Sequence, residues 1–254
     1  MVIGLEVFKE YFKNHKDKYI IIGGTACDYW ITEAGFKYRA TKDLDIILII
    51  EVLEKDFVTV FWEFIKAGNY NKNEKSERIR KYYRFSNPTS NNFPYQIEIF
   101  SRKFDIKLAE GQVITPIPVT EDISSLSAII MDDDYYNFVK SNSEIKDEIN
   151  FANPKVLICL KASAYLDLLK KKNEGKLIDN SDIKKHRNDI IRLSAILTEE
   201  ERIILPEKIK NDLEEFISIL IKEPPDYNSI SRILGEKVNS EEILNLLRKV
   251  FNLN

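Results

Sequence analysis

The chain has 254 residues, of which 44% are hydrophobic and 11% aromatic, so it can bury a sizeable core and is not a disordered protein. Its 38 basic and 41 acidic side chains give a formal net charge of -3, so any polyanion site must be a local patch. The two cysteines, the start without a secretory signal and the lack of an apolar run of roughly 20 residues predict a cytoplasmic protein with buried free thiols.

The first 120 residues alternate between short β-rich runs and helical patterns. The expected strands cover residues 19–22, 43–50, 80–85, 95–100 and 113–119. The expected helices cover residues 25–34 and 54–67, and a further helical pattern covers 126–139. Strands interleaved with helices in this way predict a mixed sheet.

From Pro154 onward the apolar spacing is helical throughout. It predicts helices over residues 154–172 and 181–196, with more after Pro206 and Ser240. We therefore predict an α+β fold, with a mixed-sheet N-terminal domain over residues 1–150 and a mainly helical C-terminal domain over residues 151–254.

Two consecutive glycines separate the first expected strand from the helix that follows it. Glycine lets the backbone approach a ligand closely, and a helix start offers free amide N–H groups, so Gly23 and Gly24 could cradle a phosphate. Thr25 could cap the helix and offer its hydroxyl to the same phosphate. A glycine pair between strand and helix is more often only a turn, so this interpretation needs a second motif.

Asp43 and Asp45 open the next strand and supply that second motif. Residues two apart on a strand project to the same face, and two close carboxylates repel each other unless a cation lies between them. Hard oxygen ligands suit Mg²⁺ or Mn²⁺. The alternative is a solvated strand edge, but the five apolar residues that follow favour a central strand with a metal site at its mouth.

A third carboxylate is expected on the alternating strand over residues 95–100. If Ile97 and Ile99 face the core, Glu98 lies on the other face, where it could come beside the two aspartates. The alternatives are a solvent-facing glutamate at this position, and Asp105 as the third carboxylate in its place.

Other enzyme classes that use an Asp-x-Asp motif fit the flanking residues less well. In haloacid-dehalogenase-type phosphatases and one class of glycosyltransferases the aspartates close an apolar strand, whereas here they open one. The chain has no P-loop motif and no zinc motif. Of its two histidines, we interpret His15 as structural and His186 as part of a basic patch.

The order and spacing of these motifs resemble the polymerase β-like nucleotidyltransferases, in which a strand, a Gly-Gly or Gly-Ser pair and a helix precede Asp-x-Asp. The chain is most similar to the AbiEii-type family, toxins of abortive-infection and type IV toxin–antitoxin systems, where an Arg and a Thr precede the aspartates as Arg39 and Thr41 do here. The resemblance is specific over residues 19–50 and looser to about residue 195. Where the family has Ser, this chain has Gly24, with Thr25 next.

The resemblance implies a metal-dependent transferase that moves a nucleoside monophosphate from an NTP to an acceptor, either an RNA such as tRNA or a protein. It also implies an antitoxin protein as a partner. Asp43, Asp45 and Glu98 would hold Mg²⁺ or Mn²⁺, and Glu98 would act as general base. The alternative is a non-catalytic module of the same fold that binds a nucleotide or a protein.

The resemblance also assigns residues of the helical half, which would complete the active-site cleft. Lys161 would contact the nucleotide phosphates or act as acid toward the leaving group. A lone Lys in an apolar helix more often reaches out to solvent, and a solvated basic face is the alternative for the neighbouring basic residues. The predicted nucleotide-binding residues are Gly23, Gly24, Thr25, Arg39, Thr41, Lys185 and Asp189.

Overall fold

The computed structural model describes residues 3–52, 54–72, 84–101, 106–109, 112–114, 129 and 132–253. The chain divides into two compact units, residues 1–28 with 40–152 and residues 29–39 with 153–254. The segment 29–39 thus belongs with the helical half, although it lies within the predicted first domain. Asp105 and parts of three expected elements, at 80–83, 115–119 and 126–131, lie outside the described residues, apart from residue 129.

The first unit is built on a seven-stranded sheet with the order β3-β4-β5-β2-β1-β9-β8. Its strands are β1 (Tyr19–Ile22), β2 (Asp43–Leu48), β3 (Asn71–Lys72), β4 (Arg84–Ser86), β5 (Gln96–Phe100), β8 (Ser143–Lys146) and β9 (Ile149–Ala152). β1 runs antiparallel to β2, while β2 and β5 are parallel. This mixed sheet and the surrounding helices confirm the α+β class. A separate antiparallel pair joins β6 (Ile106–Ala109) and β7 (Gln112–Ile114).

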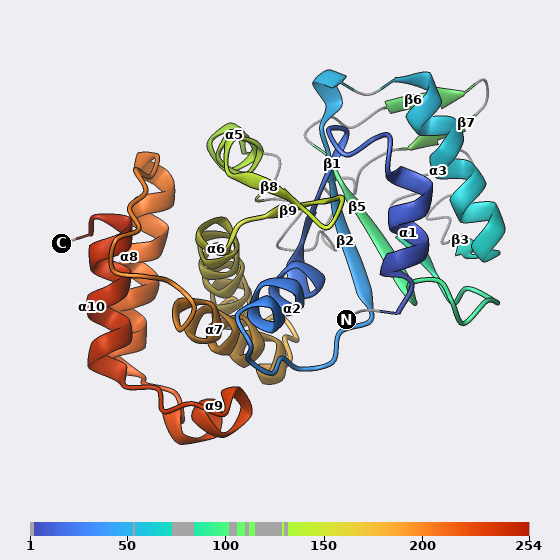
Figure 1. Cartoon of the computed structure of the whole chain (residues 1–254). Helices are drawn as coiled ribbons and strands as arrows, with labels where there is room; N and C mark the ends of the chain where they lie inside the picture. The colour runs from blue at the N-terminus through green and yellow to red at the C-terminus, as the bar shows by residue number, and fades with distance from the viewer. Residues whose placement is uncertain are drawn as a thin grey trace. The chain divides into compact units, whose positions relative to one another are not determined.

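The apolar side chains of the central strands β1 and β2 are buried in the core of this unit. Every residue of β1 is buried, as is β2 from Ile46 onward. Helices α1 (Leu5–Phe12) and α3 (Lys55–Gly68) lie side by side in this unit (Figure 1). Their aromatic rings meet those of the sheet, with Phe8 and Tyr19 edge to face at 5.1 Å between centroids. Such aromatic pairs add to the stability that burial alone provides.

Two further helical segments of this unit come directly after or before a strand along the chain. The 3-10 helix η1 (Ile50–Val52) follows β2, and helix α5 (Asp133–Ser141) precedes β8. Tyr136 of α5 is buried, and its hydroxyl donates to a carboxylate oxygen of Glu51 at 2.8 Å. Helix α2 (Gly23–Glu33) follows β1 directly and crosses the division between the units at residue 28.

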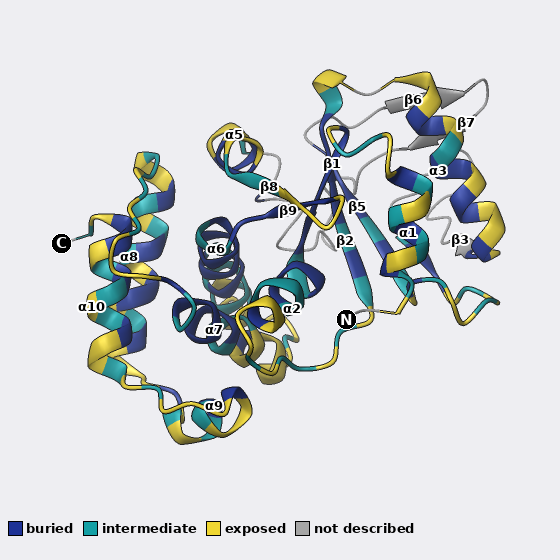
Figure 2. Cartoon of the chain, in the orientation of Figure 1, coloured by how far each residue is buried: buried dark blue, intermediate teal, exposed yellow. Residues whose placement is uncertain are grey.

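In the part of the second unit that the structure describes, five helices follow besides the end of α2. They are α6 (Pro154–Asn173), α7 (Asn180–Ser194), α8 (Glu207–Lys222), α9 (Tyr227–Leu234) and α10 (Ser240–Phe251). Helix α6 begins where the Asn153 side chain accepts a hydrogen bond from the Val156 amide at 3.1 Å, with Pro154 in the first turn. The first three turns of α6 are buried nearly all round, whereas α8 and α10 expose one face (Figure 2).

Both cysteines, Cys27 and Cys159, are buried free thiols, as the sequence predicts. In the part of the chain that the structure describes, no helix combines the length and the apolar character needed to cross a membrane.

Candidate active site

The register of the sheet aligns the predicted carboxylates on two neighbouring strands, β2 and β5. Asp45 is the antiparallel partner of Ile22 on β1 and the parallel partner of Glu98 on β5. Asp43 lies opposite Gln96 in the same ladder. Because register partners and alternate residues share a face, Asp43, Asp45 and Glu98 project from one face of the sheet. The alternation in the sequence predicts this placement of Glu98.

The glycine turn at the end of β1 lies directly against Asp45. Gly23 has φ +67°, a left-handed conformation that favours glycine, and it is the first residue of α2. A Cβ atom added there would overlap Oδ2 of Asp45, so the close approach also requires glycine. A helix leaves its first amide N–H groups without an intrahelical partner and carries the positive end of its dipole there. The start of α2 therefore brings these groups next to a carboxylate of the candidate metal site.

Thr25 ties the glycine turn to the first aspartate. Its buried hydroxyl donates a hydrogen bond to the backbone carbonyl of Asp43 at 2.6 Å. Because α2 begins at Gly23, Thr25 lies inside the first turn and is not the cap of the helix. The single hydroxyl proton is used by Asp43, so a donated bond to phosphate, which stays a prediction, would require it to change partner.

Glu98 is held by two polar neighbours, Arg84 on the adjacent strand β4 and Gln96 on its own strand β5. Its Oε1 accepts from Arg84 Nη2 at 2.7 Å and from Gln96 Nε2 at 2.9 Å. The Glu98 side chain is 12% exposed and that of Arg84 is 39% exposed. Arg84 is not predicted from the sequence, because it comes opposite Glu98 only through the register of β4 against β5.

A divalent cation needs several oxygen ligands close to one another. Among the described residues, no three His, Cys, Asp or Glu side chains are arranged to hold a metal ion together. Mg²⁺, however, is usually bound through one or two carboxylates, with water and substrate phosphates completing its shell. Asp43 and Asp45 fit that pattern from one face of β2. Glu98 uses Oε1 for Arg84 and Gln96, so its other carboxylate oxygen would be the one to reach a metal ion while that ion pair stays closed.

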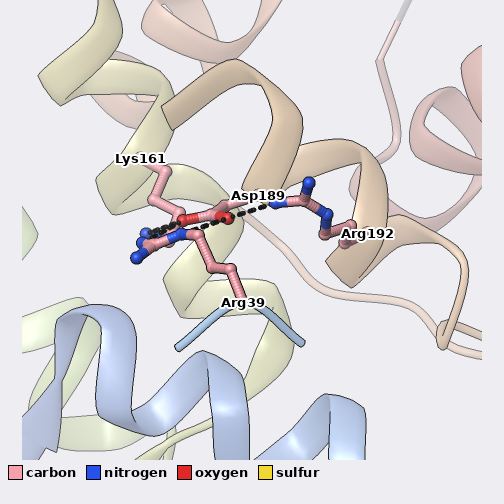
Figure 3. A network of polar contacts seen from close by, with 4 residues as sticks. All are labelled: Arg39, Lys161, Asp189 and Arg192. Atoms are coloured by element: carbon pink, nitrogen blue, oxygen red, sulfur yellow. Dashed lines mark hydrogen bonds and ion pairs between the residues drawn. The ribbon is translucent and has the colours of Figure 1, made fainter. Parts of the chain in front are cut away.

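A second group of predicted residues converges on Asp189 in the helical unit (Figure 3). Asp189 is fully buried, and its two oxygens contact Arg39 Nη2 at 2.9 Å, Lys161 Nζ at 2.9 Å and Arg192 Nη1 at 3.0 Å. Lys161 is only 6% exposed, so the alternative in which it reaches out to solvent does not hold. Arg192 was missed in the sequence, although its spacing of three residues from Asp189 on a helix is a recognisable signal.

The charges of this network set its protonation states. Burial alone would raise the pKa of Asp189, but the Lys161 ammonium and the Arg39 guanidinium outweigh it and hold that pKa well below its usual range. Burial of the ring and the nearby Lys161 charge lower the pKa of His186 to about 3. His186 is therefore neutral at pH 7 and adds no charge to the basic patch, contrary to the sequence interpretation.

The predicted site residues thus form two groups, one in each unit. The first unit holds Gly23, Gly24, Thr25, Thr41, Asp43, Asp45 and Glu98, and the second holds Arg39, Lys161, Lys185 and Asp189. Lys185 is exposed on α7 and is not among the side chains that contact Asp189. No protein-family model matches the chain, and a search of curated proteins finds no relative. Function is therefore inferred from motifs and geometry.

Proposed function

We propose that the chain is a metal-dependent nucleotidyltransferase that moves a nucleoside monophosphate from an NTP to an acceptor hydroxyl. The observation that carries this proposal is the placement of the glycine turn at Gly23 against Asp45, with Asp43 fixed to the same turn through Thr25. A helix start that suits phosphate and a pair of hard-oxygen ligands beside it match the two ends of an NTP–Mg²⁺ complex.

In this proposal, different residues of the first unit bind phosphate, bind the metal ion and accept a proton. The amides at the start of α2 would bind the terminal phosphates, while Asp43 and Asp45 would hold Mg²⁺ or Mn²⁺. When bound, the divalent ion supplies charge stabilisation to the transferring phosphoryl group. A bond forms between the acceptor oxygen and the α-phosphorus, the bond to the β-phosphate oxygen breaks, and pyrophosphate leaves. Glu98 would accept the proton of the acceptor hydroxyl.

The network of the second unit enters the proposal through the resemblance alone. Its three cationic side chains and one carboxylate carry a formal excess of two positive charges. Lys161 would offset the negative charge of the departing pyrophosphate, and Lys185 and Arg39 would contribute to nucleotide binding. By the same resemblance, with Arg39 and Thr41 before the aspartates, the chain would act as a toxin that an antitoxin protein restrains.

Calorimetric titration with each of the four NTPs in the presence of Mg²⁺ tests the proposal. We expect binding that depends on the metal, and we expect the Asp43→Asn/Asp45→Asn protein to lose more than about tenfold in affinity because both ligand charges are removed. The matched control is Asp133→Asn/Asp134→Asn, which removes two exposed aspartates from α5 of the same unit.

Two results would contradict the proposal. If the unaltered protein binds none of the four NTPs, the non-catalytic module becomes the better description. If the Asp43→Asn/Asp45→Asn protein binds as tightly as the control, the two aspartates do not form the metal site.

A further inference from the structure

Strand β8 forms one edge of the seven-stranded sheet in the first unit. It pairs with β9 on one side, and among the described elements only β9 packs extensively against it. The last two residues of β8 and the turn after them are exposed (Figure 2). Ile145 is 55% exposed, and an exposed apolar residue on a strand edge favours association with another strand.

The β8–β9 hairpin determines which backbone groups point outward from this edge. Its two-residue turn, Asp147 and Glu148, has positive φ at both positions, and Lys146 is the register partner of Ile149. In such a hairpin the pair beside the turn is hydrogen-bonded, and bonded and non-bonded pairs alternate from there. Ile145 comes next, so its N–H and C=O point away from β9. Among the described residues, no backbone hydrogen bond from outside the hairpin reaches it.

A second copy of β8 fits this edge in an antiparallel register centred on Ile145. Antiparallel strands bond through residues whose backbone groups point outward, so the Ile145 N–H and C=O of one copy can bond those of the other. The two isoleucine side chains then lie directly opposite each other on one face of the joined sheet. Such a contact reduces the exposure of both side chains to water.

The charges of β8 complement themselves in this register. Glu144 and Lys146 lie on one face of the strand, and their charged atoms are 3.7 Å apart. With the two-fold axis at Ile145, Glu144 of each copy lies opposite Lys146 of the other. An axis one residue earlier would instead place two Glu144 carboxylates opposite each other, which is unfavourable. A lysine on an edge strand usually prevents association, but here it meets a carboxylate.

We propose that the chain forms a symmetric dimer in which β8 pairs antiparallel with β8 of a second copy, with the two-fold axis at Ile145. The pairing joins the two seven-stranded sheets into one continuous sheet. Each β8 has only four residues, so the association is weak and depends on protein concentration. This inference goes beyond nucleotide transfer and does not rest on it.

Sedimentation equilibrium of the full chain tests the proposal at low ionic strength, where exposed ion pairs are least screened. Over protein concentrations of about 10 to 500 µM, the average mass should rise toward twice that of one chain. A mass that stays at that of one chain over the whole range would overturn the proposal and leave β8 as an edge protected by its lysine.

Exchange of the two charges tests the register. Glu144→Lys places two ammonium groups opposite each other, and Lys146→Glu places two carboxylates there. Each single change should raise the dimer dissociation constant about 5- to 30-fold, because two attractive pairs become repulsive. The double variant Glu144→Lys/Lys146→Glu restores opposite charges and should dimerise as the unaltered protein does. An equimolar mixture of the two single variants should also dimerise, because each copy then meets the opposite charge.

Two further variants complete the test. Glu63→Lys makes the same charge change at an exposed position of α3 and should leave dimerisation unchanged. Ile145→Pro removes the central backbone donor, which the ladder with β9 does not use, and should raise the dissociation constant more than about tenfold. If Ile145→Pro unfolds in a thermal scan, the charge variants decide alone.

The remaining outcomes count against the proposal. Dimerisation that both single charge variants leave unchanged would place the contact outside β8. Dimerisation that each single variant weakens, but that neither the double variant nor the mixture restores, would overturn the two-fold register at Ile145.

Discussion

The carboxylates of the two units differ in their burial and in their charged neighbours. In the second unit Asp189 is fully buried, and Arg39, Lys161 and Arg192 surround it. In the first unit Asp43 and Asp45 are only partly buried at the start of β2. A buried carboxylate must have its charge balanced by the protein, whereas a partly exposed pair can take a cation from solution. The comparison favours a structural role for Asp189 and supports the proposal that the aspartates of β2 bind a metal ion.

The largest expected effect comes from removing the charge at the centre of the second unit. Asp189→Asn would leave three cationic side chains around a neutral group, two of them buried, and should lower the free energy of unfolding by about 3–5 kcal/mol. Urea unfolding followed by Trp30 fluorescence in a Trp62→Phe background reports on this unit, because Trp30 lies in segment 29–39.

Two variants complete this measurement. Asp134→Asn, at an exposed position of α5, is the control and should leave stability unchanged. A loss of less than about 1 kcal/mol in Asp189→Asn would mean that the network is not needed to hold the second unit together. Lys161→Met added to Asp189→Asn should recover part of the loss, because it removes one of the unbalanced charges.

A smaller effect is expected from His186, whose contribution to the free energy of unfolding of the second unit depends on pH. With a pKa of about 3 in the folded state and about 6.5 when unfolded, the unfolded chain takes up the proton first as the pH falls. The contribution of His186 to stability is therefore complete above pH 6.5 and is lost toward pH 3. The expected loss is about 2 kcal/mol between pH 6.5 and pH 5.

Urea unfolding at a series of pH values checks this prediction. His186→Gln should flatten the dependence of stability on pH in that window, and His15→Gln is the matched control for loss of a histidine. Asp189, whose pKa is lowered, contributes stability that is lost only below its ordinary pKa of 3.8, so the two groups are separated by pH. An unchanged pH dependence in His186→Gln would show that the pKa of His186 is the same in the folded and the unfolded protein.

The smallest expected effect concerns Arg84. It is a cationic partner of Glu98 in the first unit, as Arg39, Lys161 and Arg192 are for Asp189 in the second. Arg84→Gln removes the cation that holds Glu98 and should strengthen Mg²⁺-dependent NTP binding roughly three- to tenfold, because Arg84 no longer offsets the charge of Glu98. Stability should change by no more than about 1 kcal/mol, since Arg84 is partly exposed.

Calorimetry with NTP and Mg²⁺ gives the readout for Arg84→Gln, and Arg202→Gln, in the second unit, is the control. Weaker NTP binding in Arg84→Gln would show that Arg84 itself contacts phosphate and that Glu98 is not a metal ligand.

The sequence predicts those parts of the fold that depend on local patterns. The buried strands at 19–22 and 43–48 follow from continuous apolar runs, and the start of α6 follows from Asn153 and Pro154. The position of Glu98 follows from alternation along a single strand. Strands β8 and β9 were missed, because each has only four residues and β9 gains its place by pairing with the distant β1.

The partners of the site residues were harder to predict because they come from distant parts of the sequence. Arg39 and Asp189 are 150 residues apart, and no local pattern links them except through the family resemblance. Arg84 faces Glu98 only through the register of two strands. Nucleotide binding by these residues stays a prediction. Their positions within each unit depend on contacts between segments that are distant in the sequence, so no single segment predicts them.

The assignment of residues 29–39 to the helical unit has a consequence for how the protein is made. The chain passes between the units three times, after residues 28, 39 and 152, so a single cut cannot release either unit intact. On the ribosome, Arg39 emerges long before the α7 carboxylate that it binds. Residues 40–188 are synthesised between Arg39 and its carboxylate partner, and such contacts between distant residues slow folding. A fragment that begins at residue 153 would lack Arg39 and so could never complete the charge balance around Asp189.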